Sequence, residues 1–347
     1  IHTQVTGLMK SFVANQHVGL ITTLSLAQYL QIFQRVTPQS LRLNRKKTSL
    51  TLPKVVEFKL FQEASDMNVV IDSISKTYAN DGFVFPIDVV TEEEATCIRA
   101  DLEKAEAECV NHPEKLALLR SYPDRLIPSF DQLVRSEKLI KAVEPMLGFD
   151  LMVWSAGLFI KEANTDKIVT WHQDLTYWGL NNAEEVTAWV ALSPSNIDSG
   201  CMRFVPGSHK KRLVTHRDTF DDKNLLSRGQ EISVEVDDSS GVDVVLNTGQ
   251  ASLHHGHLFH SSGPNSTGDR RIGSAIRYIK TSMKQNTGDK SLVALVNGED
   301  RYKNFTVAEG PKGWLHEEDF EACRRDAEIK KRILYDGANS DKGKRYR

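Results

Sequence analysis

From Gly148 onward, short runs of β-branched and aromatic residues alternate with turn-forming Gly, Pro, Asn and Asp. We expect strands at residues 151–161, 186–193, 231–236, 242–247, 251–255 and 272–280. No helical pattern lies between these strands. Such a series favours an antiparallel sandwich or barrel over a parallel sheet.

The part of the chain before Gly148 carries helical signals instead. We expect a helix, a short strand at 82–86 and a second helix between Ser73 and Glu106, and further helices over 130–147 and 317–335. Thr91 and Glu94 form a capping box that begins the second helix. The predicted fold class is therefore mainly β with flanking helices (α+β).

Charge divides the 347-residue chain into two unlike parts. Residues 1–56 contain no Asp or Glu but seven Lys and Arg, so this stretch carries +7. The rest of the chain holds 37 basic and 46 acidic residues and carries −9, which gives no reason to expect nucleic acid as a partner. The four cysteines lack CxxC spacing, which predicts packing thiols in a reducing compartment rather than a zinc site.

The basic leader at residues 1–56 has the composition of an organelle transit peptide, which would direct the protein to a mitochondrion or plastid. The alternative is an N-terminal extension packed on the domain of a cytoplasmic protein. Its apolar run between Val18 and Phe33 is interrupted by polar residues, so we expect no membrane span. We expect one domain over 66–335 and a polar tail at 336–347. The sequence carries no signal for an oligomeric state.

The tripeptide His172-Gln173-Asp174 is the first candidate for metal binding. In an extended chain residues i and i+2 point to the same side, so His172 and Asp174 can reach one ion. A borderline metal such as Fe(II) accepts this nitrogen and oxygen pair, and one further histidine completes a face that leaves three positions open. The tripeptide alone is weak support, because it also occurs in surface and hydrogen-bonding roles.

Four clustered histidines, His254, His255, His257 and His260, can supply the third ligand. On one strand His254 and His260 share a face, but six residues separate them, roughly 20 Å, so both cannot bind one ion. We favour His260, because the turn at 261–265 would hold its imidazole at the open mouth of a barrel. The other three are expected to pack or to form hydrogen bonds around the site.

Four linked motifs around these residues resemble the phytanoyl-CoA dioxygenase (PhyH) family of Fe(II)- and 2-oxoglutarate-dependent oxygenases. They are residues 171–174, 189–192, 199–209, and the stretch 260–265 followed by Arg271. Order and spacing match as well as identity, and the resemblance covers roughly residues 78–279. It implies a double-stranded β-helix, a jelly-roll (cupin-like) barrel with N-terminal helices packed on it.

The resemblance implies that His172, Asp174 and His260 hold Fe(II) as a facial triad, with open positions for 2-oxoglutarate and O2. Family members that halogenate lack the carboxylate, because the halide needs that position. Asp174 is present, so the resemblance allows hydroxylation, desaturation and oxidative cyclisation.

The resemblance also implies a cosubstrate site. Arg271 would bind the distal carboxylate of 2-oxoglutarate through its planar guanidinium fork. The neighbouring Arg270 is the alternative, but its side chain should point to the opposite face of the strand. Ser262 would add a hydroxyl to the same carboxylate. Trp189 would form a wall of the pocket, or is a plain core tryptophan.

The expected function is that of an Fe(II)- and 2-oxoglutarate-dependent dioxygenase. It would couple decarboxylation of 2-oxoglutarate, to succinate and CO2, with hydroxylation of an unactivated C–H bond in a small organic substrate. Ascorbate is a candidate reductant. The alternatives are cyclisation or desaturation in secondary metabolism and, less favoured, a non-catalytic jelly-roll binding protein, which has no use for an arginine aimed at an open coordination face.

Two further features allow more than one interpretation. The basic turn at 208–212 could meet an anionic substrate, although a solvated loop is favoured. Tyr177 and Trp178 could line the substrate pocket or simply pack. The identity of the substrate is not predicted, because it depends on the shape of loops.

Overall fold

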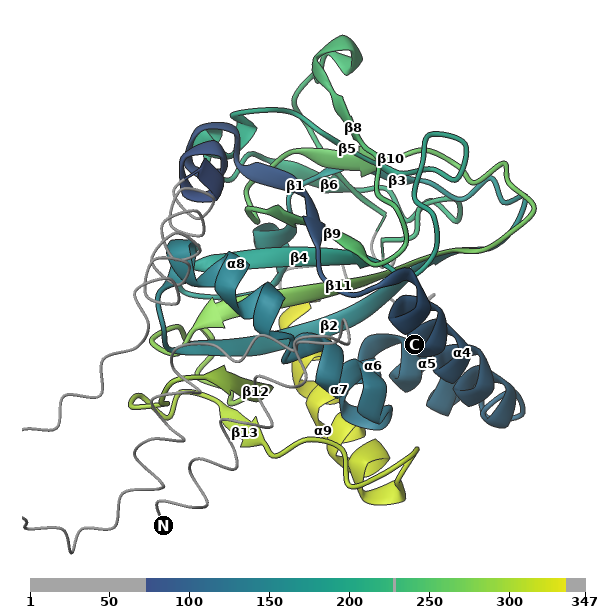
Figure 1. Ribbon diagram of the computed structural model, residues 1–347. Helices are drawn as coiled ribbons and strands as arrows, with labels where there is room; N and C mark the ends of the chain where they lie inside the picture. The colour runs from purple at the N-terminus through teal and green to yellow at the C-terminus, as the bar shows by residue number, and fades with distance from the viewer. Residues whose placement is uncertain (1–72, 227–228, 335–347) are drawn as a thin grey trace, which may run out of the picture. The chain divides into compact units, whose positions relative to one another are not determined.

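The computed structural model describes residues 73–226 and 229–334 (Figure 1). Residues 73–81 are helical, and the helices that follow are α4 (Glu92–Glu108), α5 (Pro113–Ser121), α6 (Pro123–Leu126), α7 (Pro128–Val134), α8 (Glu137–Leu147) and α9 (Glu317–Leu334). The predicted leader at 1–56 and tail at 336–347 lie outside the described residues. None of the described helices is long and apolar enough to cross a membrane.

The described strands form two facing sheets and a two-stranded ribbon. The large sheet has the order β1 (Phe83–Asp88), β9 (Gln250–His254), β4 (Glu185–Ala191), β11 (Arg271–Lys280), β2 (Leu151–Lys161), β12 (Leu292–Asn297) and β13 (Thr306–Ala308). The small sheet has the order β3 (Val169–His172), β10 (His260–Ser262), β5 (Met202–Phe204) and β8 (Val242–Val244). The ribbon pairs β6 (His216–Asp218) with β7 (Gln230–Ile232), and the 3₁₀ turns are η2 (Asp174–Tyr177), η3 (Ser208–Lys211) and η4 (Asp238–Ser240).

The predicted fold class is confirmed. The predicted antiparallel pairing is also confirmed for the described strands, except that β12 pairs parallel with β13. The bounds of β2 agree with the prediction, and those of β4, β9 and β11 agree to within two residues. The predicted strands at 231–236 and 242–247 are shorter, ending at Ile232 and Val244. Strands β3, β5, β6, β10, β12 and β13 were not predicted, because most are too short to show an alternating pattern.

The prediction of one helix over residues 130–147 is wrong. The chain leaves the helical conformation at Ser136, whose ψ is 125°. At the end of α7 the N–H of Arg135 donates to the Asp131 carbonyl, and a separate helix, α8, begins after Ser136. Serine is favoured immediately before a helix. By contrast, the predicted capping box is confirmed: Thr91 Oγ1 accepts from the Glu94 N–H, and Glu94 Oε2 accepts from the Thr91 N–H.

The two faces of the large sheet have different surroundings. Along β11, Ile272, Ile276 and Tyr278 join the core that the sheet shares with the helices, whereas Ala275 joins the core between the two sheets. Figure 1 shows α8 crossing β4 and β11, and α5 and α6 lying beside β2. Because successive side chains in a strand alternate, Arg271 and Arg277 share the face of Ala275 and point between the sheets.

Candidate metal and cosubstrate site

His172, Asp174 and His260 converge between the two sheets. One ligand atom from each lies within 4.8 Å of the others, and all three residues are buried. His172 and His260 are directly opposite each other on β3 and β10, with ring centroids 4.0 Å apart. Asp174 begins η2, and its Oδ1 lies 3.6 Å from Nε2 of His172. The structure therefore brings together the three residues that the sequence nominated as ligands.

Both imidazoles are oriented by backbone carbonyls. Nδ1 of His172 lies 2.9 Å from the Thr170 carbonyl oxygen, and Nδ1 of His260 lies 2.9 Å from that of Leu258. A carbonyl oxygen only accepts, so Nδ1 donates and Nε2 of the neutral ring keeps its lone pair for a ligand bond. Burial, together with the nearby His172, holds the pKa of His260 well below its usual value, which favours the neutral, metal-binding form.

The carboxylate of Asp174 stays ionised despite its burial. Burial alone would raise its pKa, but the imidazoles of His172 and His254 beside it bring the pKa well below its usual value. Its Oδ2 lies 3.8 Å from Nε2 of His254 and accepts a long hydrogen bond of 3.5 Å from Thr187 Oγ1. Two imidazoles and one carboxylate, buried beside a pocket, are a donor set that suits Fe(II).

The expectation that His254 lies far from His260 is wrong, because their ring centroids are 4.9 Å apart. His254 ends β9 and His260 begins β10, and the five residues between them carry the chain from the large sheet to the small one. The spacing of an extended strand therefore does not apply. His254 is nevertheless not one of the three residues whose ligand atoms all lie within 4.8 Å of one another. Its Nε2 lies beside the carboxylate of Asp174 instead.

Gln173 is a supporting residue that sequence reasoning missed. It is completely buried and its side-chain amide donates to the carbonyls of Arg212 and His257, while its oxygen accepts from the Val214 N–H. It therefore ties the strand that carries His172 to two neighbouring loops. The only signal in the sequence was its place between two candidate ligands.

Arg271 lies at the start of β11 and lines the same pocket as the triad. Its side chain is 2% exposed, and no described residue forms a hydrogen bond with its Nε. The guanidinium carbon lies 5.2 Å from the centre of the Trp189 ring, which is also part of the pocket wall. Burial lowers the pKa of Arg271 to about 10, so the group remains charged at neutral pH. An unpaired buried cation beside the triad is suited to an anionic ligand.

Lys161 is a buried basic residue beside Arg271 that sequence reasoning missed. It is the direct partner of Arg271 across β2 and β11, and its side chain is buried. Its ammonium donates to Ser262 Oγ at 2.6 Å and to the Gly263 carbonyl. Burial, and then the charge of Arg271, lower its pKa to about 6. The available signal was a lysine at the end of a strand whose pattern predicts burial.

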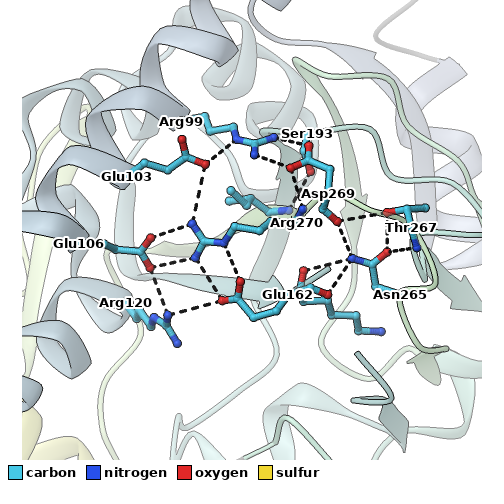
Figure 2. Close-up of polar contacts among 12 residues, drawn as sticks. Arg99, Glu103, Glu106, Arg120, Glu162, Ser193, Asn265, Thr267, Asp269 and Arg270 are labelled. Atoms are coloured by element: carbon cyan, nitrogen blue, oxygen red, sulfur yellow. Dashed lines mark hydrogen bonds and ion pairs between the residues drawn. The ribbon is translucent and has the colours of Figure 1, made fainter. Parts of the chain in front are cut away.

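The loop from Gly263 to Arg270 is held by the polar network in Figure 2. Asn265 is completely buried and donates to the carbonyls of Glu162 and Asp269. Arg270 points away from the pocket, as predicted, and its guanidinium pairs with Glu106 and Glu162. The network therefore ties the ends of β2, β10 and β11 together, and these ends carry Lys161, Ser262 and Arg271.

The pocket that the triad lines has a cavity volume of about 30 Å³. Its lining includes the triad, Trp189, Ser262 and Arg271, with Phe159, Val169, Met202 and Ala275 as apolar members. Trp178 lies outside this lining and packs against Trp154, with ring centroids 5.2 Å apart. Tyr177 packs edge-on against His216. In the turn at 208–212, Lys210, Lys211 and Arg212 are exposed.

Residues 78–273, more than half of the chain, match the profile of the phytanoyl-CoA dioxygenase (PhyH) family. The chain belongs to this family. The match confirms the predicted family. The jelly-roll fold is confirmed with it.

Individual relatives agree with this membership. A probable alpha-ketoglutarate-dependent hypophosphite dioxygenase of Stutzerimonas stutzeri is 29% identical over 158 residues, which cover 45% of this chain and 54% of that protein. The peroxisomal phytanoyl-CoA dioxygenase of Mus musculus is 24% identical, covering 63% of this chain and 71% of that protein. The apo structure of the non-heme monooxygenase ThoJ has a TM-score of 0.69 at 29% identity, covering 76% of this chain and 98% of that chain. The chain thus spans about half the length of the first of these relatives.

Proposed function

We propose that this PhyH-family chain hydroxylates an unactivated C–H bond in a small organic substrate and converts 2-oxoglutarate to succinate and CO2. One observation carries the proposal: a buried group of two histidines and a carboxylate shares a pocket with an unpaired, buried Arg271. A purely structural metal site would gain nothing from a cation aimed at its open side. This argues against the alternative of a non-catalytic binding protein.

In this proposal His172 and His260 hold the metal through Nε2, and Asp174 holds it through its carboxylate. Bound Fe(II) supplies the means to activate O2 with electrons from 2-oxoglutarate, and ascorbate could restore the reduced metal. The backbone carbonyls fix the two rings, and Thr187 and His254 orient the carboxylate of Asp174.

The other end of the pocket would bind the cosubstrate. Arg271 would pair with the distal carboxylate through its guanidinium fork, and Lys161 would add a second positive charge. Ser262 already accepts from Lys161, which leaves its own proton free to donate to the same carboxylate. The indole of Trp189 would exclude water from this end of the pocket.

Anaerobic addition of Fe(II) and 2-oxoglutarate tests the proposal. We expect the weak visible charge-transfer band of a chelated complex in the wild-type protein and its loss in His172→Ala. Arg301→Met serves as a control because Arg301 is exposed and contacts only Glu299 among the described residues. Folded wild-type protein without the band, or His172→Ala with it, would contradict the proposal. Mass analysis of the product would then separate hydroxylation, which adds one oxygen, from cyclisation or desaturation, which removes two hydrogens.

We also propose that residues 66–335 form the catalytic domain and that the basic leader at 1–56 is an organelle address. The proposal rests on its lack of acidic residues and its charge of +7. N-terminal sequencing of the mature protein purified from its source is the test. Mature protein that still carries residues 1–50 would favour the alternative of an N-terminal extension.

A further inference from the structure

Arg277 is a second buried arginine in the pocket lining, besides Arg271, and neither the triad nor the cosubstrate site uses it. Its side chain is 8% exposed and lines the pocket beside Asp174 and Thr187. No described residue forms a hydrogen bond with its Nε, and the guanidinium makes one long contact, from Nη1 to the Ala275 carbonyl at 3.4 Å. A guanidinium has five N–H donors, so most of those of Arg277 lack an acceptor in the described protein.

Two acidic residues face Arg277 without pairing with it. Asp174 contacts the imidazoles of His172 and His254, and Oε2 of Glu185 lies 3.4 Å from Oγ1 of Thr187. Neither forms an ion pair with Arg277 in the described structure. Burial, and then the charge of Asp174, raise the pKa of Glu185 well above its usual value, which favours its neutral form. Arg277 therefore lies near the charge of Asp174 but forms no ion pair with a described residue, and leaving its buried donors unsatisfied is costly.

The position of Arg277 separates it from the cosubstrate site. Arg271 and Arg277 share one face of β11 but lie six residues apart, roughly 20 Å along an extended strand. The residues between them on this face are Gly273, against which the Trp189 indole packs, and Ala275, which lines the pocket. A five-carbon dicarboxylate anchored at Arg271 and chelated at the triad is too short to reach Arg277 as well.

The aromatic surroundings hold the guanidinium in place. Its carbon lies 4.9 Å from the centre of the Trp178 ring and 5.9 Å from that of Phe159. Cations are attracted to aromatic faces at such distances. The rings thus orient Arg277 without satisfying its hydrogen-bond donors, and Phe159 gives the adjacent pocket wall an apolar surface.

We propose that Arg277 binds an oxyanion of the primary substrate, a carboxylate or a phosphate group, so that this enzyme acts on small organic acids. The inference rests on the proposed function and adds the substrate class. The planar guanidinium matches either oxyanion with two parallel hydrogen bonds. The anion would lie at the Arg277 end of the pocket, and the carbon skeleton would extend past the apolar wall toward the triad.

Thermal unfolding of the full-length protein loaded with Ni(II) and 2-oxoglutarate tests the inference. Nickel replaces Fe(II) so that no turnover occurs. The probes are short- and medium-chain carboxylates and alkyl phosphates, each matched with its neutral amide or ester. We expect the anions to raise the Tm and their neutral partners to have no effect. The larger rise identifies carboxylate or phosphate as the preferred group. Equal effects of anion and neutral partner, or no binding of any anion, would overturn the inference.

Substitutions of Arg277 provide a second test of the inference. In Arg277→Met we expect the Kd of the best anion to rise by about 10- to 100-fold, as for the loss of a charge-assisted pair. Arg277→Lys should retain part of the affinity, and the exposed-site variant Arg301→Met all of it. The affinity for 2-oxoglutarate should not change in Arg277→Met, which separates this inference from the proposed function. Wild-type anion affinity in Arg277→Met, or loss of 2-oxoglutarate binding there, would reject the assignment.

If Arg277→Met does not fold, Arg277→Lys and the wild-type comparison of charged and neutral probes still decide the question. Failure of the wild-type protein to bind Ni(II) with 2-oxoglutarate would count against the proposed function instead.

Discussion

A Cβ atom on Gly273 would lie 1.8 Å from Cζ2 of Trp189, so the indole occupies the space that a side chain at residue 273 would need. Both residues lie in the large sheet, and the same indole lies over Arg271. The absence of a side chain at residue 273 therefore allows Trp189 to form the wall of the cosubstrate pocket.

Gly273→Ala should push Trp189 out of its position and weaken the binding of 2-oxoglutarate. We expect the KM for 2-oxoglutarate to rise by about tenfold or more, and overpacking to cost about 1–3 kcal/mol of stability. Succinate formation at varied 2-oxoglutarate and thermal unfolding measure the two effects. Gly268→Ala is the matched control, because a Cβ there meets nothing within 4 Å. An unchanged KM in folded Gly273→Ala would show that the position of the indole does not matter for the cosubstrate.

His254 should act on the metal only through Asp174. We expect His254→Ala to weaken Ni(II) binding by about 10- to 100-fold, the usual effect of losing a residue that orients a ligand. His172→Ala should abolish binding. Calorimetric titration of the metal-free variants compares the two. Complete loss of metal binding in His254→Ala would make His254 a ligand.

The affinity for 2-oxoglutarate should fall as the pH rises above 6. The pKa of Lys161 is lowered from 10.5 to about 6 in the free protein, so the side chain is mostly neutral at pH 7 and above. An anionic ligand favours the charged form, so binding takes up a proton and weakens by up to about tenfold per pH unit. Titrations at several pH values, in buffers of different ionisation enthalpy, measure the affinity and the proton uptake. In Lys161→Met we expect weaker binding with little pH dependence, and a wild-type-like dependence there would exclude Lys161 as its source.

The same pKa shift affects stability with a definite sign. Between about pH 6 and 10.5 the unfolded chain holds the Lys161 proton and the folded chain does not. The contribution of this group to the free energy of unfolding of the ligand-free protein therefore rises with pH across this window. In denaturant unfolding, the free energy of unfolding of the wild-type protein minus that of Lys161→Met should therefore increase as the pH rises across this window. A signed difference that falls as the pH rises would contradict the lowered pKa.

Asn265→Ala should loosen the loop between β10 and β11. The substitution removes the donor to three backbone carbonyls, those of Lys161, Glu162 and Asp269. We expect a loss of about 1–3 kcal/mol in the free energy of unfolding, because buried acceptors would be left unpaired. Weaker 2-oxoglutarate binding should accompany it. Ser266→Ala, in the exposed part of the same loop, is the control. Equal stability of the two variants would show that the network in Figure 2 does not hold the loop.

The family, the fold class and the three candidate ligands could all be predicted from the amino-acid sequence. These inferences depend on patterns that are local in the chain, such as strand alternation, the capping box at Thr91 and the pairing of His172 with Asp174 two residues later. Arg270 and Arg271 could be separated for the same reason, since adjacent residues of a strand point to opposite faces. Local geometry suffices for residues one or two positions apart in an extended stretch of chain.

Which residues from different elements share the pocket could not be predicted without the three-dimensional arrangement of the chain. His254 lies beside His260 because the chain passes from one sheet to the other between them, so spacing along one strand could not predict their separation. The pairing of Lys161 with Arg271 depends on the register of β2 against β11. Whether Arg277 finds a hydrogen-bond acceptor depends on the strands and loops that surround its side chain, and these are distant in the sequence. Such contacts come from long-range packing, which short patterns in a sequence do not encode.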